Sequence, residues 1–330
     1  NEILRIEPRT NHKVNRYWLT DEQRKNYKWV NENRVTEPMI NVNSELKPVD
    51  WNEAYDYAAR SLAKFKPSEI MFVGSPKATN EDNYILNKFA KNVVKSNNVD
   101  FLKHINSSEN EDGFLINKDK APNTAGVLEL GLSAQGTSYS LAQLPELIKT
   151  HKIKALYVME EDFAHYSHIL PSLDELELLI VHSYNFNELT KKADVVIASS
   201  TFAEIEGTFT NYKKLVQHFK PALVTKENMR IMGMKMSRLD KFGAKNDNWT
   251  QHEERNCRQS WRSLMHIAKL MGTTWNYKTS EDIFEEISEK VPGFKFMDYD
   301  KLDEFAGLYI GKGDKPEPRK MEYESHFYKP

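Results

Sequence analysis

The stretch AEIEGTFTNYKKLVQ, residues 203–217, places glycine, threonine and asparagine directly after an apolar stretch, DVVIAS. In α/β proteins, backbone N–H groups and short polar side chains at the carboxyl ends of parallel strands hold ligands. Gly207 is expected to take a positive φ, Thr208 and Thr210 to bond local backbone, and Asn211 to contact the edge of a ring. The same residues can also simply shape a turn, so ligand contact and turn formation both stay open.

A second polar cluster, EEDFAHYSH at residues 160–168, also follows an apolar stretch. His165 and His168 are three residues apart and can share a metal on a helix, but the HExxH pattern is missing and no second ligand cluster is evident. A solvated helix start with carboxylates at its positive end explains the same residues. The sequence therefore predicts no metal site.

Cys257 is the only cysteine in the chain. A disulfide needs two cysteines and a [4Fe–4S] cluster normally needs four thiolates, so this chain alone can hold no conventional iron–sulfur cluster. A small buried residue is the simplest interpretation of Cys257. Nucleophilic catalysis finds no support either, because no G-x-S-x-G elbow occurs. No catalytic pair of carboxylates is predicted, because a chain with 48 acidic residues contains such pairs by chance.

The composition indicates a globular α/β protein. With 330 residues, 39% hydrophobic content and a formal charge of −2, the chain suits about two domains and has no broad attraction to nucleic acid or anionic lipid. No apolar run is long enough to cross a bilayer, and the first ten residues do not resemble a targeting segment. Any partner must be recognised by local shape.

Strand and helix patterns alternate along most of the chain, which predicts a Rossmann-like parallel sheet with crossover helices. No G-x-G-x-x-G is present, so the dinucleotide fingerprint is absent. A Thr-x-x-Asp pattern from Thr79 and an Asp50 or Asn52 cap mark two helix starts. The predicted helices are 49–65, 79–94, 141–153, 165–176, 187–193, 254–272 and 280–291, and the predicted strands are 69–76, 97–102, 154–160, 176–183 and 194–199.

The remaining segments are a small irregular N-terminal cap, a long polar connection over 103–140, a basic linker over 234–248 and a polar tail. The cap interleaves arginines with tyrosines and tryptophans. Such a surface can stack on nucleic acid or form a protein interface, and the near-neutral chain favours the interface.

Several segments together resemble the molybdopterin-oxidoreductase-type region in the large peripheral-arm subunit of respiratory complex I (NADH:quinone oxidoreductase). In the cap the resemblance rests on the order of a PR turn, an Asn before a Trp, an Asp-x-x-Arg and a closing R-x-x-x-P. It continues through WNEAYDYAARSLAKF, ATNEDNYILNKFAKNVVKSNNVD and APNTAGVLELGL, and its most specific part is DVVIASSTFAEIEGTFTNYKKLVQ. It covers roughly residues 3–275.

The resemblance implies a molybdopterin-oxidoreductase fold in three parts: a cap similar to a degenerate iron–sulfur small domain (1–45), a reduced α/β domain (46–275) and a C-terminal helix with an extended tail (276–330). It also implies a vestigial pterin cleft formed by Asn123, Gly126, Glu206, Gly207, Thr208 and Asn211. The chain departs from the family because the cluster cysteines are absent and one nucleotide-binding lobe is largely excised. No catalytic residue and no cofactor is therefore expected in this chain, with molybdopterin as the alternative.

These observations lead to the expectation of a non-catalytic structural subunit of a complex-I-like NADH:quinone oxidoreductase. Its partners would be other subunits of that complex, especially the iron–sulfur subunits, and neither nucleic acid nor direct membrane insertion is expected. It would lie on the cytoplasmic side of a bacterial inner membrane, or on an organelle matrix side, as a peripheral subunit. The alternatives are a molybdopterin-binding oxidoreductase subunit and a soluble nucleotide-binding module.

Overall fold

The computed structural model describes residues 2–134, 136, 138–228 and 255–315. Most of its strands are short, buried and separated by helices. The strands are β1 (Met39–Val42), β2 (Glu45–Pro48), β3 (Ile70–Gly74), β4 (Val99–Phe101), β5 (Ala155–Met159), β6 (Leu178–Ser183), β7 (Val195–Ala198), β8 (Gly207–Thr210), β9 (Leu215–Phe219) and β10 (Leu308–Tyr309).

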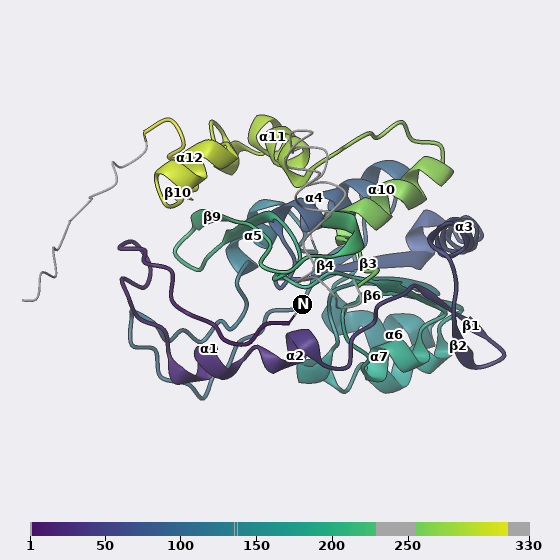
Figure 1. Cartoon of the computed structure of the whole chain (residues 1–330). Helices are drawn as coiled ribbons and strands as arrows, with labels where there is room; N and C mark the ends of the chain where they lie inside the picture. Colours follow the sequence, from purple (N-terminus) through teal and green to yellow (C-terminus); the bar gives the residue numbers. More distant parts are fainter. Residues whose placement is uncertain (1, 135, 137, 229–254, 316–330) are drawn as a thin grey trace, which may run out of the picture.

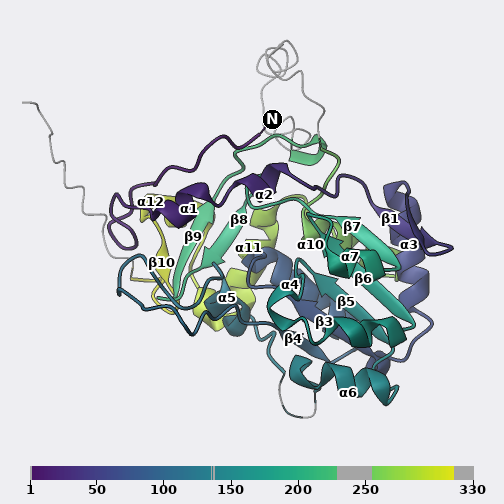
Figure 2. The ribbon, with the colours of Figure 1, turned by 90° about the horizontal axis from the view of Figure 1, so that it is seen from below.

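In the described residues the strands form a seven-stranded sheet of order β2-β1-β7-β6-β5-β3-β4 and a three-stranded sheet of order β10-β9-β8. Strands β3 to β7 run parallel to one another, whereas β1 pairs antiparallel with β7 and β2. Figure 2 shows the large sheet and the small sheet side by side. The predicted α/β fold with a Rossmann-like parallel sheet is confirmed.

Helices cover both faces of the large sheet (Figure 1). One face carries α3 (Trp51–Leu62), α4 (Asn80–Lys88) and α10 (Ser260–Leu270), and the other carries α6 (Leu144–Lys149) and α7 (Glu188–Lys192). Because both faces are covered, β3, β5, β6 and β7 are buried at every position and are dominated by apolar residues. The other α-helices are α1 (Asp21–Lys25), α2 (Lys28–Asn31), α5 (Thr124–Glu129), α11 (Ser280–Lys290) and α12 (Tyr299–Glu304).

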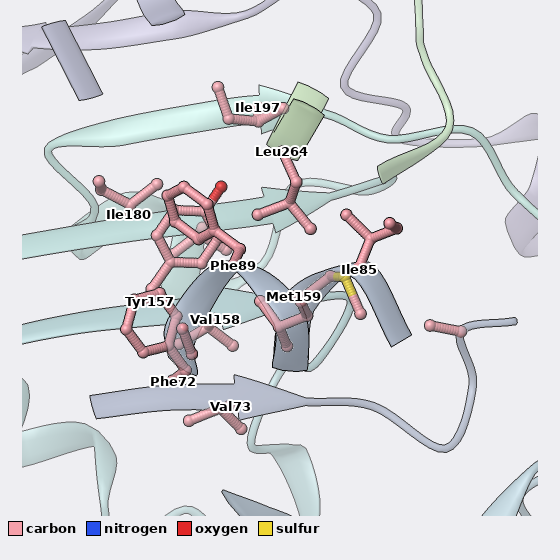
Figure 3. Packing of buried hydrophobic residues seen from close by; sticks show 14 of the residues in the cluster. Phe72, Val73, Ile85, Phe89, Tyr157, Val158, Met159, Ile180, Ile197 and Leu264 are labelled. Atoms are coloured by element: carbon pink, nitrogen blue, oxygen red, sulfur yellow. The ribbon is translucent and has the colours of Figure 1, made fainter. Parts of the chain in front are cut away.

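Aromatic and aliphatic side chains fill the space between the sheet and α4 (Figure 3). The rings of Phe72, Phe89 and Tyr157 lie in mutual contact, with centroids 5.5 to 6.0 Å apart. Such contacts add to the free energy gained by burying the rings. The core therefore joins β3 to β5, which are separated along the chain by β4 and α5, around one sheet.

Both predicted caps of the helices next to this core are confirmed. Asp50 accepts hydrogen bonds from the backbone N–H groups of Asn52 and Glu53, and Thr79 accepts one from Asp82. Each cap satisfies backbone donors that have no partner within the helix.

Two helix predictions were wrong, and one polar stretch forms strands. The segment predicted as a helix over 165–176 forms two short 3₁₀ helices, η4 (Ala164–Tyr166) and η5 (Leu170–Glu175), and Pro171 lies at the start of the second. The helix predicted over 254–272 begins only at Ser260. The stretch at 203–217, for which the sequence left ligand contact and turn formation open, contains the β8–β9 hairpin. Short helical turns also occur at η1 (Pro67–Glu69), η2 (Phe89–Val94), η3 (Leu141–Gln143) and η6 (Pro292–Phe294).

The predicted linker over 234–248 lies outside the described residues. The division into 1–45, 46–275 and 276–330 stays a prediction. Across the part of the chain that the structure describes, no helix has both the length and the apolar character needed to cross a membrane.

Candidate functional site

The stretch that opened the sequence analysis forms a strand hairpin. Asn211 closes it, because its side-chain oxygen accepts hydrogen bonds from the backbone N–H groups of Lys213 at 2.9 Å and Leu215 at 3.1 Å. Gly207 lies in β8 and is not among the positive-φ glycines of the described chain, so the expected positive φ was wrong. The glycine instead permits close packing: a Cβ there would lie 2.8 Å from Thr79 Cγ2 and 3.0 Å from Glu81 Oε2.

The first turn of α4 binds the β8 strand through buried side chains. Glu81 accepts hydrogen bonds from the backbone N–H of Thr208 at 3.0 Å and from its hydroxyl at 2.9 Å. Asn80 donates to the hydroxyls of Thr208 at 2.9 Å and Thr210 at 3.1 Å. Because a buried polar group left without a partner is costly, these bonds specify how the hairpin docks on the helix.

Asn123 joins the same network from the loop before α5. Its side-chain oxygen accepts a hydrogen bond from the N–H of Thr210 at 2.8 Å, and its amide donates to the Ala78 carbonyl at 2.9 Å. Gly126 makes this approach possible, since a Cβ there would lie 2.0 Å from Asn80 Oδ1 and 2.2 Å from Asn123 Oδ1.

Five side chains of this network are fully buried and together form what we call the buried polar framework: Asn80, Glu81, Asn123, Thr208 and Thr210. The structure thus brings four predicted cleft residues together: Asn123, Gly126, Gly207 and Thr208. Glu206 and Asn211 lie beside them, Asn211 at the turn and Glu206 with one carboxylate oxygen 3.4 Å from His218. Their role as cofactor contacts stays a prediction.

Glu81 is the acidic centre of the framework. Burial raises the pKa of Glu81 to about 7, although hydrogen bonds from Thr208 and Tyr299 oppose the shift. The ring of His218 stacks on Tyr299 with a centroid distance of 4.0 Å. Glu81 of α4 and His218 of β9 therefore lie on either side of Tyr299 of α12.

Glu204, from the ST-x-x-E motif, is the centre of a second buried cluster. Arg34 donates to both carboxylate oxygens, at 3.0 and 2.8 Å, and Arg255 donates at 2.7 Å. Despite its burial, these guanidinium groups hold the pKa of Glu204 below its ordinary value. The cluster joins the N-terminal segment, which contains Arg34, to the segment after β7, which contains Glu204.

Cys257 lies beside this cluster and not on a helix. Ser200 donates a hydrogen bond to its sulfur at 3.2 Å, and burial raises the pKa of the thiol to about 12. A neutral, buried thiol is unreactive. The described residues also contain no group of three or more His, Cys, Asp or Glu side chains placed to hold a metal ion, and His165 and His168 are exposed.

A pocket of about 760 Å³ lies at the carboxyl edge of the parallel sheet. Its residues follow β3, β5, β6 and β7, or come from the N-terminal segment, the connection before α5, and β8. The lining residues are Asn26, Trp29, Glu32, Asn33, Lys77, Lys120, Pro122, Glu160, Glu161, Asp162, Ser183, Tyr184, Asn185, Phe186, Asn187, Phe202, Ile205 and Phe209. Ligands bind at this edge in open α/β sheets, where the chain reverses its direction across the sheet.

The sequence analysis singled out two segments of this pocket, residues 160–162 and the stretch that contains Ile205 and Phe209, but it did not predict that they line one pocket. Lys77 and Tyr184 each follow a buried strand, which is the signal that could have found them. Phe202 carries the same signal, because it follows the buried strand β7. Trp29 belongs to the N-terminal segment, which follows no buried strand, and only the tertiary fold brings it to the pocket.

The fold and this edge pocket define an α/β protein of the kind that holds ligands at the ends of parallel strands. Comparison with protein families is more specific: the molybdopterin oxidoreductase family matches residues 34–124 and 99–231. The chain belongs to this family.

Similar proteins include formate dehydrogenase subunits. The F420-dependent formate dehydrogenase subunit alpha of Methanocaldococcus jannaschii is 34% identical over 112 residues, which cover 34% of this chain and 16% of that protein. The F420-dependent formate dehydrogenase 1 subunit alpha of Methanococcus maripaludis is 39% identical over 77 residues, covering 23% of this chain and 11% of that protein. The matched regions are therefore a small part of these relatives.

Among solved structures, acetylene hydratase from Pelobacter acetylenicus resembles this chain with a TM-score of 0.50 and 9% identity, covering 88% of this chain and 68% of that one. This likeness concerns the fold alone. The predicted resemblance to the molybdopterin oxidoreductase region is thus confirmed at the level of the family.

The family implies a molybdopterin cofactor, and the residues present can be tested against it. In the buried polar framework, the Asn80, Asn123 and Thr208 side chains donate to or accept from one another or nearby protein groups. A ligand could use them only by breaking buried hydrogen bonds, which costs free energy. Asn123 and Thr208 therefore fit the cofactor only if these buried hydrogen bonds open, and the role of the other predicted cleft residues stays a prediction.

Proposed function

We propose that this chain is a non-catalytic, architectural subunit of a multi-subunit oxidoreductase. The observation that carries the proposal is the buried polar framework, whose side chains hold the β8–β9 hairpin against α4. In a cofactor site, the corresponding polar groups would face a ligand. Here they stabilise the fold, and the single cysteine is a buried neutral thiol.

The resemblance to the large peripheral-arm subunit of respiratory complex I favours a complex-I-like NADH:quinone oxidoreductase as the host complex. In that proposal the chain sits beside iron–sulfur subunits as a peripheral component on the aqueous face of an energy-converting membrane. The N-terminal segment supports a docking role, because it exposes Leu4, Tyr17 and Trp18 with 78%, 49% and 62% of their surface accessible. Large exposed apolar side chains beside arginines are typical of protein interfaces.

A molybdopterin-binding oxidoreductase subunit is the second candidate. Family membership and the similarity to proteins named formate dehydrogenase subunits favour it. In that case the host would be a formate dehydrogenase-type assembly. This candidate function requires either that the hydrogen bonds of the buried polar framework break or that other residues bind the cofactor.

The first proposal is tested by tagging the full chain in its source organism, purifying it under mild conditions and identifying co-purifying subunits by mass spectrometry. We expect redox subunits that carry iron–sulfur clusters, and we expect deletion of the chain to reduce the amount of assembled complex. A complex that assembles fully and retains its quinone reductase activity without this chain would refute the proposal.

Two surface variants refine this experiment. Trp18→Ala removes an exposed ring of the N-terminal segment and should lower the yield of co-purifying subunits. Leu270→Ala is the matched control, since Leu270 is similarly exposed, at 56% against 62% for Trp18, but lies at the end of α10. Equal yields from both variants would exclude docking through Trp18.

A further inference from the structure

One end of the molecule carries a group of exposed lysines. Three segments from distant parts of the sequence meet there: residues 211–214, 293–297 and 309–315. The N–H of Ile310 donates to the carbonyl of Lys214 at 3.0 Å, and the N–H of Gly311 donates to that of Gly293 at 2.8 Å. Figure 1 and Figure 2 both show β9, β10 and α12 together at this end.

The exposed lysines of these segments form what we call the basic patch: Lys213, Lys214, Lys295, Lys312 and Lys315. Among the described residues their ammonium groups form no ion pair, in contrast to the neighbouring Lys220, which pairs with Asp303 at 3.0 Å. Asp314 is the one carboxylate within the three segments. The patch therefore keeps an excess of positive charge in a chain whose formal charge is −2.

Aromatic rings hold several of these ammonium groups at the surface. Those of Lys213, Lys295 and Lys312 each lie 5.3 to 5.8 Å from the centroid of a neighbouring ring. Such a ring attracts a cation without neutralising its charge. Phe296, one of the rings, is 55% exposed and has a φ of 68°, which bulky L residues rarely adopt. Strained backbone of this kind is typical of sites where a side chain is presented for a contact.

The basic patch is continuous with the N-terminal segment that we propose as a docking surface. The side-chain amide of Asn11 donates to the Ala306 carbonyl at 2.9 Å, and Nζ of Lys13 lies 6.0 Å from the ring centroid of Tyr309. The exposed ring of Trp18 follows in the same segment. Apolar aromatic side chains surrounded by a polar rim are the usual composition of a protein interface.

Carboxylates bound the patch and limit the kind of anion that fits. Along the chain, α12 lies between two of the patch segments, and it exposes Asp300 and Glu304. A bilayer surface or a nucleic acid extends beyond the patch and would be repelled by these carboxylates, whereas an acidic segment of a folded protein can end before them. The arrangement therefore favours a protein as the partner.

We propose that the basic patch docks an acidic segment of a neighbouring subunit, beside the aromatic contact of the N-terminal segment. The lysines attract the carboxylates of the partner, which speeds association and fixes the relative orientation of the two proteins. This inference rests on the proposed architectural role and adds the chemistry of the partner surface.

Zero-length cross-linking tests the contact in the complex purified with the tagged full chain. A carbodiimide joins a lysine amine to a carboxylate where the two groups touch, so it records the proposed pairs directly. We expect amide bonds between patch lysines and an acidic peptide of another subunit, identified by mass spectrometry. Absence of any cross-link from the patch to another subunit would overturn the proposal.

Charge reversal tests the lysines themselves. One variant combines Lys213→Glu, Lys295→Glu and Lys312→Glu, and the full chain is titrated with a fluorescent oligoglutamate peptide. Binding should weaken by at least about threefold, because each exposed pair contributes about 1.4- to fivefold to an affinity. Glutamine at the same three positions should have a smaller effect. The matched control has the same net charge because it reverses three exposed lysines outside the patch: Lys64, Lys152 and Lys269.

Two other anionic probes test the choice of a protein partner: phosphatidylglycerol vesicles and a short DNA duplex. Binding of either probe that depends on the patch lysines, without binding of the peptide, would assign the patch to lipid or nucleic acid and overturn the proposal. Equal effects of the patch variant and its control on peptide binding would overturn it too.

The patch variant also separates this inference from the architectural role. It should lower the yield of co-purifying subunits, whereas the control variant should not. A complex that is lost when the chain is deleted but is unchanged in the patch variant overturns this inference alone. A complex that assembles fully without the chain refutes the architectural role, and cross-links from the patch to an acidic segment would still support docking of a protein.

Discussion

Replacing Glu204 by glutamine is expected to destabilise the fold strongly. Glu204 accepts three hydrogen bonds from Arg34 and Arg255 and two from Thr201, and its side chain is fully buried, with Arg34 only 4% exposed. Glutamine has nearly the same shape but no charge, so two guanidinium groups lose their counter-ion. Removing one partner of a buried ion pair typically costs about 3 to 5 kcal/mol.

The assay is urea unfolding followed by circular dichroism at neutral pH, with the free energy of unfolding obtained by linear extrapolation. Glu188→Gln is the control, because the Glu188–Lys191 pair is exposed and should change the free energy of unfolding by less than about 0.5 kcal/mol. A loss below about 1 kcal/mol for Glu204→Gln would refute the assignment of Glu204 as the anchor of the N-terminal segment.

The same variant has a pH signature. Since the pKa of Glu204 is lower in the folded protein than its ordinary value of 4.5, the ionised group adds stability that is present above about pH 4.5 and lost as the pH falls further. We therefore expect the difference between wild type and Glu204→Gln to shrink in acid. A difference that stays constant from pH 7 to pH 3 would contradict the ionised cluster.

Three further predictions concern the framework and the thiol. Gly126→Ala places a methyl group 2.0 Å from Asn80 Oδ1 and should lower the free energy of unfolding by about 1 to 3 kcal/mol. Urea unfolding measures this change. An unchanged midpoint of the urea transition would contradict the close packing around Gly126. Because the pKa of Glu81 is raised to about 7 from 4.5, the contribution of its protonated form to stability is complete below about pH 4.5. This contribution is lost as the pH rises to about 7, by about 3 kcal/mol at most. Glu81→Gln should remove this part of the pH dependence of the free energy of unfolding, and an identical pH profile in the variant would exclude Glu81 as its source. Cys257 should react with a thiol reagent at neutral pH only after denaturation, and rapid labelling of the folded chain would show that the thiol is neither buried nor neutral.

The sequence predicted the parallel sheet well because its strands are short apolar runs separated by helix starts with clear caps, as at Asp50 and Thr79. It predicted a continuous helix over 165–176 because the apolar spacing fits one, but Pro171 cannot donate a backbone hydrogen bond there and the segment forms 3₁₀ turns. Local pattern favours helix in such a segment, whereas tertiary packing decides which turns form.

The candidate site was only partly predictable for the same reason. The polar stretch after β7 was found, but its partners Asn80 and Glu81 look like ordinary residues at the start of a helix. Only the folded structure shows that they lie against Thr208 and are fully buried. Gly207 was assigned a positive φ because glycine in a polar stretch often has one, whereas its actual constraint is close contact with Thr79.

The central claim is that the residues expected to contact a cofactor now hold the fold together. It is tested most directly by measuring molybdenum and tungsten in the full chain purified with its partners, together with a mass-spectrometric search for released pterin. The account predicts that both metals are far below one equivalent per chain and that pterin is absent. Near-stoichiometric metal together with pterin in this chain would contradict it.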